Sequence, residues 1–137
     1  MTTDDRTFRL GDLQLAIMKV LWRLGAATVA DVHEQLAEQQ LAYTTIATML
    51  RKMEDRGLVS HAAPTGEGHA RRFVFRPAVS EQDVTRGMTD DLVERLFEGS
   101  LSSTVSHLLE AREVSAEELD AIEQLVRRHK RNRREPS

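Results

Sequence analysis

The residues whose types and spacing could do chemistry lie in one stretch, residues 43–57, which reads YTTIATMLRKMEDRG. At about 100° per residue, Thr44, Thr48, Arg51 and Asp55 fall on one side of a helix. Small hydroxyls reach phosphates or base edges, and an arginine can make two hydrogen bonds to guanine. These are the side chains that a helix in a DNA major groove needs. Taken alone, however, the stretch favours an ordinary amphipathic surface helix, and only the rest of the chain can decide for DNA binding.

Other chemistry finds no support in the residue pattern. The histidines are scattered and none has an i, i+4 partner that could share a metal ion; they are His33, His61, His69, His107 and His129. The chain has no cysteine and no glycine-rich phosphate-binding motif, and no nucleophile stands beside a base. We therefore expect no enzyme activity, no catalytic residues, no metal site and no cofactor.

Two helices are predicted ahead of this stretch. Asp12 is the expected N-cap of a first helix that Gly25 ends. Thr28 and Asp31 have capping-box spacing, which predicts a second helix to about Gln39. A short turn then leads to the third helix at about Thr44, whose apolar face is formed by Ile46, Met49, Leu50 and Met53. Two helices joined by a tight turn, the second with a polar outer face, form a helix-turn-helix.

A basic β-hairpin is predicted after the third helix. Residues 58–61 form a short strand, residues 64–68 a turn-rich loop, and residues 71–76 the return strand. Phe73 and Phe75 are two residues apart and share a face, which we expect to close the core. The neighbouring Arg71 and Arg72 would then meet a phosphate backbone. Three helices and a basic hairpin make a winged helix-turn-helix over residues 1–78.

Residues 79–137 are predicted to form a helical dimerisation region with a basic tail. Three amphipathic helices are expected, with the following apolar positions: Val84, Met88, Leu92, Leu96, Leu108, Leu109, Leu119, Ile122, Leu125 and Val126. Stripes this narrow, over about 50 residues, rarely make a core of their own. We expect them to bury against a second copy. The tail, RRHKRNRREPS, is expected to be solvated and disordered, and contact with DNA is the alternative.

The charge of the 137-residue chain is unevenly divided. The net charge is −3, but residues 1–78 hold 10 Lys/Arg and 9 Asp/Glu, whereas residues 79–126 hold 3 and 12. The first region can therefore present a basic face to nucleic acid. No apolar run approaches the roughly 20 residues of a membrane span, and residues 1–10 are polar. We expect a cytoplasmic protein without membrane insertion.

Three segments resemble the penicillinase-repressor family, which includes BlaI, MecI and CopY. They are RLGDLQLAIMKVLWRLGAATVADVHEQL, AYTTIATMLRKMEDRGLV and RRFVFRP, which together extend over residues 9–77. The resemblance implies a bacterial repressor that binds palindromic, double-stranded operator DNA as a homodimer. By position it also implies DNA contacts from the third helix and the hairpin, through Thr44, Thr45, Thr48, Arg51, Lys52, Arg71 and Arg72.

The resemblance also bears on how the repressor is released. The copper-responsive branch uses C-terminal cysteines, and this chain has none. The β-lactam branch is released when a membrane sensor-protease pathway leads to cleavage in the dimerisation region, and the equivalent stretch here is near His107 and Leu108. The expectation is a mainly α, winged-helix repressor. A β-lactam is one inducing signal that the resemblance offers, and the sequence leaves the inducer open. The alternative is a winged-helix protein-interaction module without DNA binding.

Overall fold

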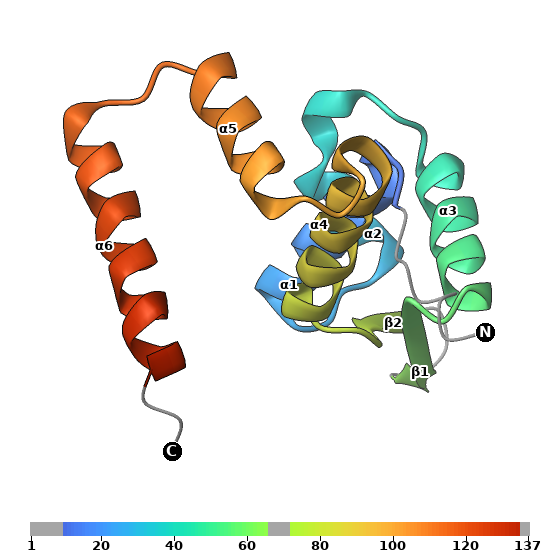
Figure 1. The fold of residues 1–137 in the computed structure, drawn as a ribbon. Coiled ribbons are helices and arrows are strands. Elements are labelled where there is room, and N and C mark those ends of the chain that lie inside the picture. Colours follow the sequence, from blue (N-terminus) through green and yellow to red (C-terminus); the bar gives the residue numbers. More distant parts are fainter. Residues whose placement is uncertain (1–9, 66–71, 135–137) are drawn as a thin grey trace. The chain divides into compact units, whose positions relative to one another are not determined.

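The helices and the hairpin follow the expected order in the computed structural model, which describes residues 10–65 and 72–134 (Figure 1). The elements are α1 (Asp12–Leu24), α2 (Val29–Gln35), the 3-10 turn η2 (Ala37–Gln39), α3 (Tyr43–Asp55), β1 (Val59–Thr65), β2 (Arg72–Pro77), α4 (Glu81–Phe97), α5 (Leu101–Ala111) and α6 (Ala116–Arg134). The chain divides into two compact units, Met1–Asp91 and Leu92–Ser137. The predicted class, mainly α with one hairpin, is confirmed.

The core of the first unit is built around the apolar face of α3. Ile46, Leu50 and Met53 are fully buried, as their i, i+4, i+7 spacing predicted. Side chains from α1, α2, the hairpin and α4 complete this core: Ile17, Met18, Val20, Leu21, Val32, Leu58, Val59, Phe75 and Val84. Burying one face of α3 in this way leaves its opposite face directed at solvent.

The helix boundaries depend on local capping. Thr28 Oγ1 accepts the Asp31 N–H, and Asp31 Oδ2 accepts the Thr28 N–H, both at 3.1 Å, so the predicted capping box is confirmed. Asp12 is not the N-cap of α1, because the Gly11 carbonyl already accepts the Leu15 N–H at 2.9 Å and Gly11 takes that place. The second helix ends at Gln35, earlier than predicted, and η2 forms the rest of the segment.

Replacing Thr28 by alanine should lower the free energy of unfolding by about 1 kcal/mol, because the Asp31 amide loses its acceptor. Thr28→Ser keeps the hydroxyl and should stay close to wild type. Urea titration followed by the fluorescence of Trp22, the only tryptophan, measures both. Equal losses for the two variants would contradict the role given to the cap.

The hairpin closes one side of the first unit. β1 and β2 are antiparallel, with His61 opposite Phe75, and the pairing is irregular between Ala62 and Thr65. Gly57, at φ 81°, turns the chain from α3 into β1, a conformation that a residue with a Cβ rarely adopts. On its other side β2 meets Ala27, through backbone hydrogen bonds of 3.0 and 2.8 Å between Ala27 and Phe75.

The prediction that both phenylalanines close the core is wrong for Phe73. Phe75 is buried, whereas Phe73 is 52% exposed. Two strand residues of the same face are displaced by roughly 7 Å along the strand. Phe75 sits beside Ala27 at the edge of the core, so Phe73 extends past that edge.

Val84 was predicted to line a dimer interface, and this prediction is wrong. Ser80 Oγ caps α4 by accepting the Asp83 N–H at 3.0 Å. Trp22 Nε1 donates to the Val79 carbonyl at 2.9 Å, which fixes the approach to α4 on α1. As a result Val84 is 1% exposed within the core of the first unit, and Met88 packs partly against the same core. The first compact unit therefore extends beyond residue 78, through the first turns of α4.

Val84→Ala should accordingly destabilise the first unit, by about 1–3 kcal/mol, because it leaves a cavity among buried side chains. It should leave the self-association constant unchanged. Trp22-detected unfolding and sedimentation at micromolar concentration separate the two effects. A weakened dimer with unchanged unfolding would restore Val84 to the interface.

The second unit contains the end of α4 together with α5 and α6. Ser100 Oγ accepts the Ser103 N–H at 3.0 Å, and Ser115 Oγ accepts the Glu118 N–H at 3.1 Å, so a serine caps both α5 and α6. The disorder predicted for the basic tail is wrong for residues 127–134, which are helical. Cations in a last turn are favoured by the helix dipole. None of the described helices is long and apolar enough to cross a membrane.

Candidate nucleic-acid interface

The residues of α3 that were predicted to contact DNA all lie on one face of the helix. The side chains are exposed and lie within an arc of about 120° at the rotation of an α-helix: Thr44, Thr45, Thr48, Arg51 and Lys52. The opposite face is fixed by Ile46, Leu50 and Met53 in the core. The exposed face is thus held on a rigid element, which is what accurate placement of polar side chains requires.

Of the two hairpin residues that were predicted to contact DNA, the structure describes the backbone of one. Arg71 lies outside the described residues. Arg72 begins β2, and its backbone pairs with Thr65 across the hairpin. The described part of β2 therefore places this end of the strand at the outer part of the hairpin, away from the buried Phe75.

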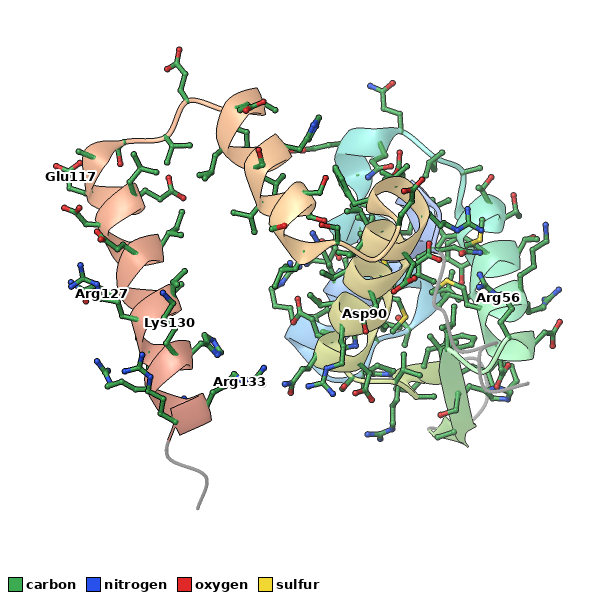
Figure 2. All side chains as sticks on the ribbon, in the orientation of Figure 1. Arg56, Asp90, Glu117, Arg127, Lys130 and Arg133 are labelled. Carbon is green, nitrogen blue, oxygen red and sulfur yellow. The ribbon has the colours of Figure 1, made fainter. Side chains whose placement is uncertain are left out.

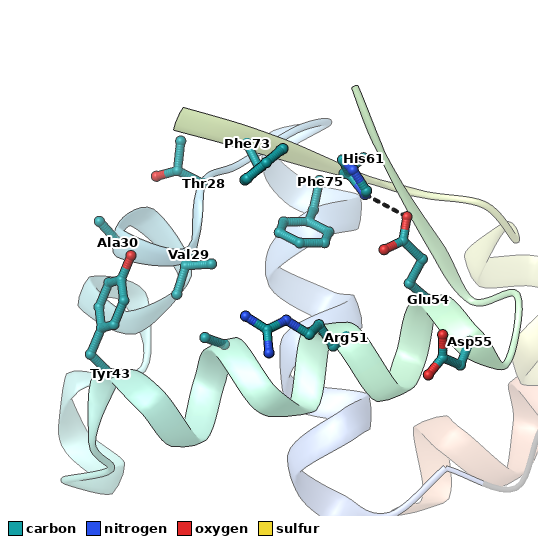
Figure 3. A pocket seen from close by; sticks show the side chains of 11 residues that line it. Thr28, Val29, Ala30, Tyr43, Arg51, Glu54, Asp55, His61, Phe73 and Phe75 are labelled. Atoms are coloured by element: carbon teal, nitrogen blue, oxygen red, sulfur yellow. Dashed lines mark hydrogen bonds and ion pairs between the residues drawn. The ribbon is translucent and has the colours of Figure 1, made fainter. Parts of the chain in front are cut away.

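A groove of about 710 Å³ runs between α3, the start of α2 and the hairpin (Figure 3). In Figure 3 the Arg51 side chain extends from α3 into this groove, with Phe73, Phe75 and His61 on the opposite wall. The lining residues are Thr28, Val29, Ala30, Tyr43, Ala47, Arg51, Glu54, Asp55, His61, Phe73 and Phe75. The polar face of α3 and the base of the hairpin therefore border one continuous surface.

A contact between Glu54 and His61 joins α3 to β1 across this groove. Glu54 Oε2 lies 2.6 Å from His61 Nδ1. The His61 ring stands edge-on to Phe73, with centroids 5.0 Å apart, and lies tilted to Phe75 at 5.7 Å. The Glu54 carboxylate is thus directed at the hairpin, which limits its repulsion of an anion that approaches the threonine face.

Both ends of α3 are also tied to other helices. His33 Nε2 lies 2.8 Å from the Leu41 carbonyl, and its ring is edge-on to Tyr43 with centroids 5.9 Å apart. At the far end, Arg56 Nη1 donates to Gln14 Oε1 at 2.9 Å. These contacts set the angle at which α3 leaves the turn after α2.

Three exposed or half-buried side chains of this surface were not predicted as site residues: Tyr43, His61 and Phe73. Tyr43 precedes Thr44 in the first turn of the helix, so its position in the sequence could have indicated it. His61 and Phe73 are brought together by strand pairing, which no spacing rule along the chain reveals. In the described part of the chain, no group of three or more His, Cys, Asp or Glu residues could hold a metal ion.

Three helices, a hairpin packed on them and an exposed polar face on the third helix define a winged helix-turn-helix protein. A family model described as penicillinase repressor matches residues 10–128. The chain belongs to this family. Its relatives are transcriptional repressors and not enzymes, which confirms the expectation that no reaction is catalysed.

Individual relatives cover most of the chain. The penicillinase repressor of Bacillus licheniformis is 27% identical over 93% of this chain and 96% of its own length. The transcriptional regulator BlaI of Mycobacterium tuberculosis is 36% identical over 83% of this chain and 80% of its own. Among solved structures, the C80S mutant of MarR from E. coli with operator DNA aligns with a TM-score of 0.49 at 12% identity, over 92% of this chain and 84% of that one.

Proposed function

We propose that this protein represses transcription by binding palindromic operator DNA as a homodimer. The observation that carries the proposal is the exposed face of α3, where three threonines, an arginine and a lysine stand opposite a fully buried stripe. The membership in a family of repressors supports it. Such a protein acts on the chromosome, so we place it in the cytoplasm.

The binding geometry follows from the sizes of helix and groove. A major groove about 12 Å wide admits one α-helix, and the exposed face of α3 supplies hydroxyls and cations along its first three turns. In this mode Arg51 reads guanine through two hydrogen bonds, while Lys52 and the threonines hold phosphates or base edges. Arg71 and Arg72 of the hairpin contact the sugar-phosphate backbone beside it. A two-fold symmetric dimer places its half-sites about one helical turn, or a multiple of it, apart.

The direct test is a mobility-shift titration with the promoter of the protein's own operon, at several salt concentrations. A sequence-selective shift that weakens steeply with salt is expected, because each phosphate contact releases counterions. A scrambled duplex of equal length is the control. A partner protein captured through α3, with no shift and no salt dependence, would instead make the domain a protein-interaction module. Sedimentation of the full chain as a monomer would refute the homodimer.

We further propose that β-lactam signalling releases the repressor through proteolysis near His107 and Leu108. Both residues lie inside α5, and Leu108 is 48% exposed. The His107 ring rests on Phe97, with centroids 5.5 Å apart. A protease that requires an extended chain would need this turn of α5 to open first. Cleavage there would separate α6 from the DNA-binding unit.

A specific protease site inserted between His107 and Leu108 should make release controllable. Cutting it should abolish the dimer and reduce operator affinity by at least about tenfold, since the gain from two linked half-sites is lost. The shift assay before and after cutting measures this. The same site inserted after Arg134 is the matched control and should leave binding intact. Full binding by the severed chain would exclude this release mechanism.

A further inference from the structure

The β-hairpin is fixed to the core at its base. At the start of the hairpin the Leu58 N–H donates to the Met53 carbonyl at 2.9 Å, and Phe75 exchanges backbone hydrogen bonds with Ala27. Further out along β2, Phe73 is 52% exposed. An exposed segment gains little from packing and opens more easily than the core beneath it. The angle between the outer hairpin and α3 therefore depends on individual side-chain contacts.

The His61 side chain connects the hairpin to α3. Its Nδ1 lies 2.6 Å from Glu54 Oε2, close enough for a ring N–H to donate to the carboxylate (Figure 3). The ring also lies edge-on to Phe73, its diagonal neighbour on the paired strand, with centroids 5.0 Å apart. The side chains of His61 and Glu54 are 39% and 31% exposed, so solvent screens the contact only in part. His61 thus contacts the last turn of α3 and the outer part of β2 at once.

The end of α3 that carries Glu54 is itself held in place. Arg56 follows the last turn of α3 (Figure 2), and its Nη1 donates to Gln14 Oε1 of α1 at 2.9 Å. Met53, the residue before Glu54, is completely buried. Glu54 therefore lies on a rigid support, and a hairpin residue bound to it takes a fixed position relative to the exposed face of α3.

This fixed position matters for a protein that contacts DNA with both elements. Arg72 begins β2 in the outer hairpin, whereas Arg51 and Lys52 lie on α3. Both sets of side chains reach one duplex only if the hairpin holds the right angle to the helix. Holding a segment in its bound conformation beforehand removes the cost of ordering it during binding.

We propose that His61 is a positioning residue for DNA binding. By joining Glu54 of α3 to Phe73 of β2, it holds the hairpin where its arginines reach the phosphate backbone while α3 lies in the major groove. His61 acts through the hairpin and makes no contact with DNA itself. The inference rests on the proposed DNA binding and adds how helix and hairpin act together. It follows that His61 contributes to affinity and leaves base selectivity unchanged.

The test variant is His61→Phe, which keeps an aromatic ring beside Phe73 and removes the nitrogen that faces Glu54. Titrations of the full chain with the promoter duplex should show binding weakened roughly three- to tenfold, the loss expected when a segment must be ordered on binding. Single-base variants of the duplex should lose affinity by the same factor. The urea midpoint followed through Trp22 should stay at the wild-type value, because the ring packing remains.

Ser60→Ala is the matched control. Ser60 precedes His61 in β1 and is exposed, and successive strand residues point to opposite faces of the hairpin. This substitution should therefore leave both DNA binding and the urea midpoint unchanged.

A thermodynamic cycle locates the effect in the hairpin. The double variant Arg71→Ala/Arg72→Ala removes the proposed phosphate contacts of the hairpin. In that background His61→Phe should cause no further loss, measured at low salt where binding is strong enough to titrate. In a Glu54→Gln background the loss from His61→Phe should persist, because the amide oxygen of glutamine still accepts the ring N–H of His61.

Every other result overturns the proposal. Equal losses with and without the hairpin arginines would place the effect outside the hairpin, as would arginine variants that bind like the wild type. Disappearance of the loss in Glu54→Gln would trace it to an exposed carboxylate, and a lowered urea midpoint would trace it to stability. Unchanged binding by His61→Phe would refute this inference alone, since the wild type still shifts the duplex. A wild type that shifts no duplex would refute the proposed function itself.

Discussion

Leu50→Ala should destabilise the first unit by about 2–5 kcal/mol, the range for removing a fully buried leucine side chain from a well-packed core. Leu50 is completely buried between α3 and the rest of the core. Unfolding by urea, followed through Trp22, measures the change. Trp22 reports on this unit because its Nε1 donates to the Val79 carbonyl, at the approach to α4.

The control for this substitution is two residues away. Lys52 is exposed on the same helix, and Lys52→Ala should change the free energy of unfolding by no more than about 0.5 kcal/mol. Both variants introduce alanine into the same helix and change its intrinsic helix propensity by a similar amount. They differ mainly in whether the replaced side chain is buried. Similar losses for Leu50→Ala and Lys52→Ala would mean that α3 does not pack as the structure describes.

Arg51→Ala should weaken binding to the correct operator by about 1–3 kcal/mol, roughly five- to 150-fold, and relax selectivity at one base position. The guanidinium lies on the exposed face of α3 and extends into the groove beside the hairpin (Figure 3). In the proposed binding mode, its loss removes two hydrogen bonds to one guanine while the proposed phosphate contacts remain. Binding titrations on the operator and on single-base variants measure the affinity and the selectivity together.

Arg51→Lys is the sharper control, because lysine keeps the charge but cannot make the planar, two-bond contact. It should keep the salt dependence of the wild type and still lose selectivity. If Arg51→Ala instead weakens binding equally on every sequence and lowers the salt slope by about one, Arg51 contacts a phosphate. Folding of both variants should be unaffected, since Arg51 is exposed.

Leu50 and Arg51 also show what could be predicted from the sequence. The period of 3.6 residues separates a buried face from an exposed face, so the core residues and the exposed residues of α3 were both predicted. Capping also acts locally, and Thr28 with Asp31 started α2 as predicted. Each of these features depends on residues within a turn or two of one another.

The features that could not be predicted depend on distant contacts. Val84 belongs to an apolar stripe, and periodicity alone does not say whether the stripe meets its own domain or a partner. The bond from Trp22 to Val79 decides it by holding the approach to α4 on α1. Phe73 and Phe75 share a strand face, but only the position of Ala27 determines where the core ends. The contact between Glu54 and His61 likewise requires the folded hairpin.

The short bridge between Ala27 and Phe75 has a consequence for how two copies can meet. A strand at the edge of a sheet presents free N–H and C=O groups to any other chain, and such edges lead to aggregation. At Phe75 both groups already bond to Ala27. A second chain therefore cannot add a strand to β2 at that point.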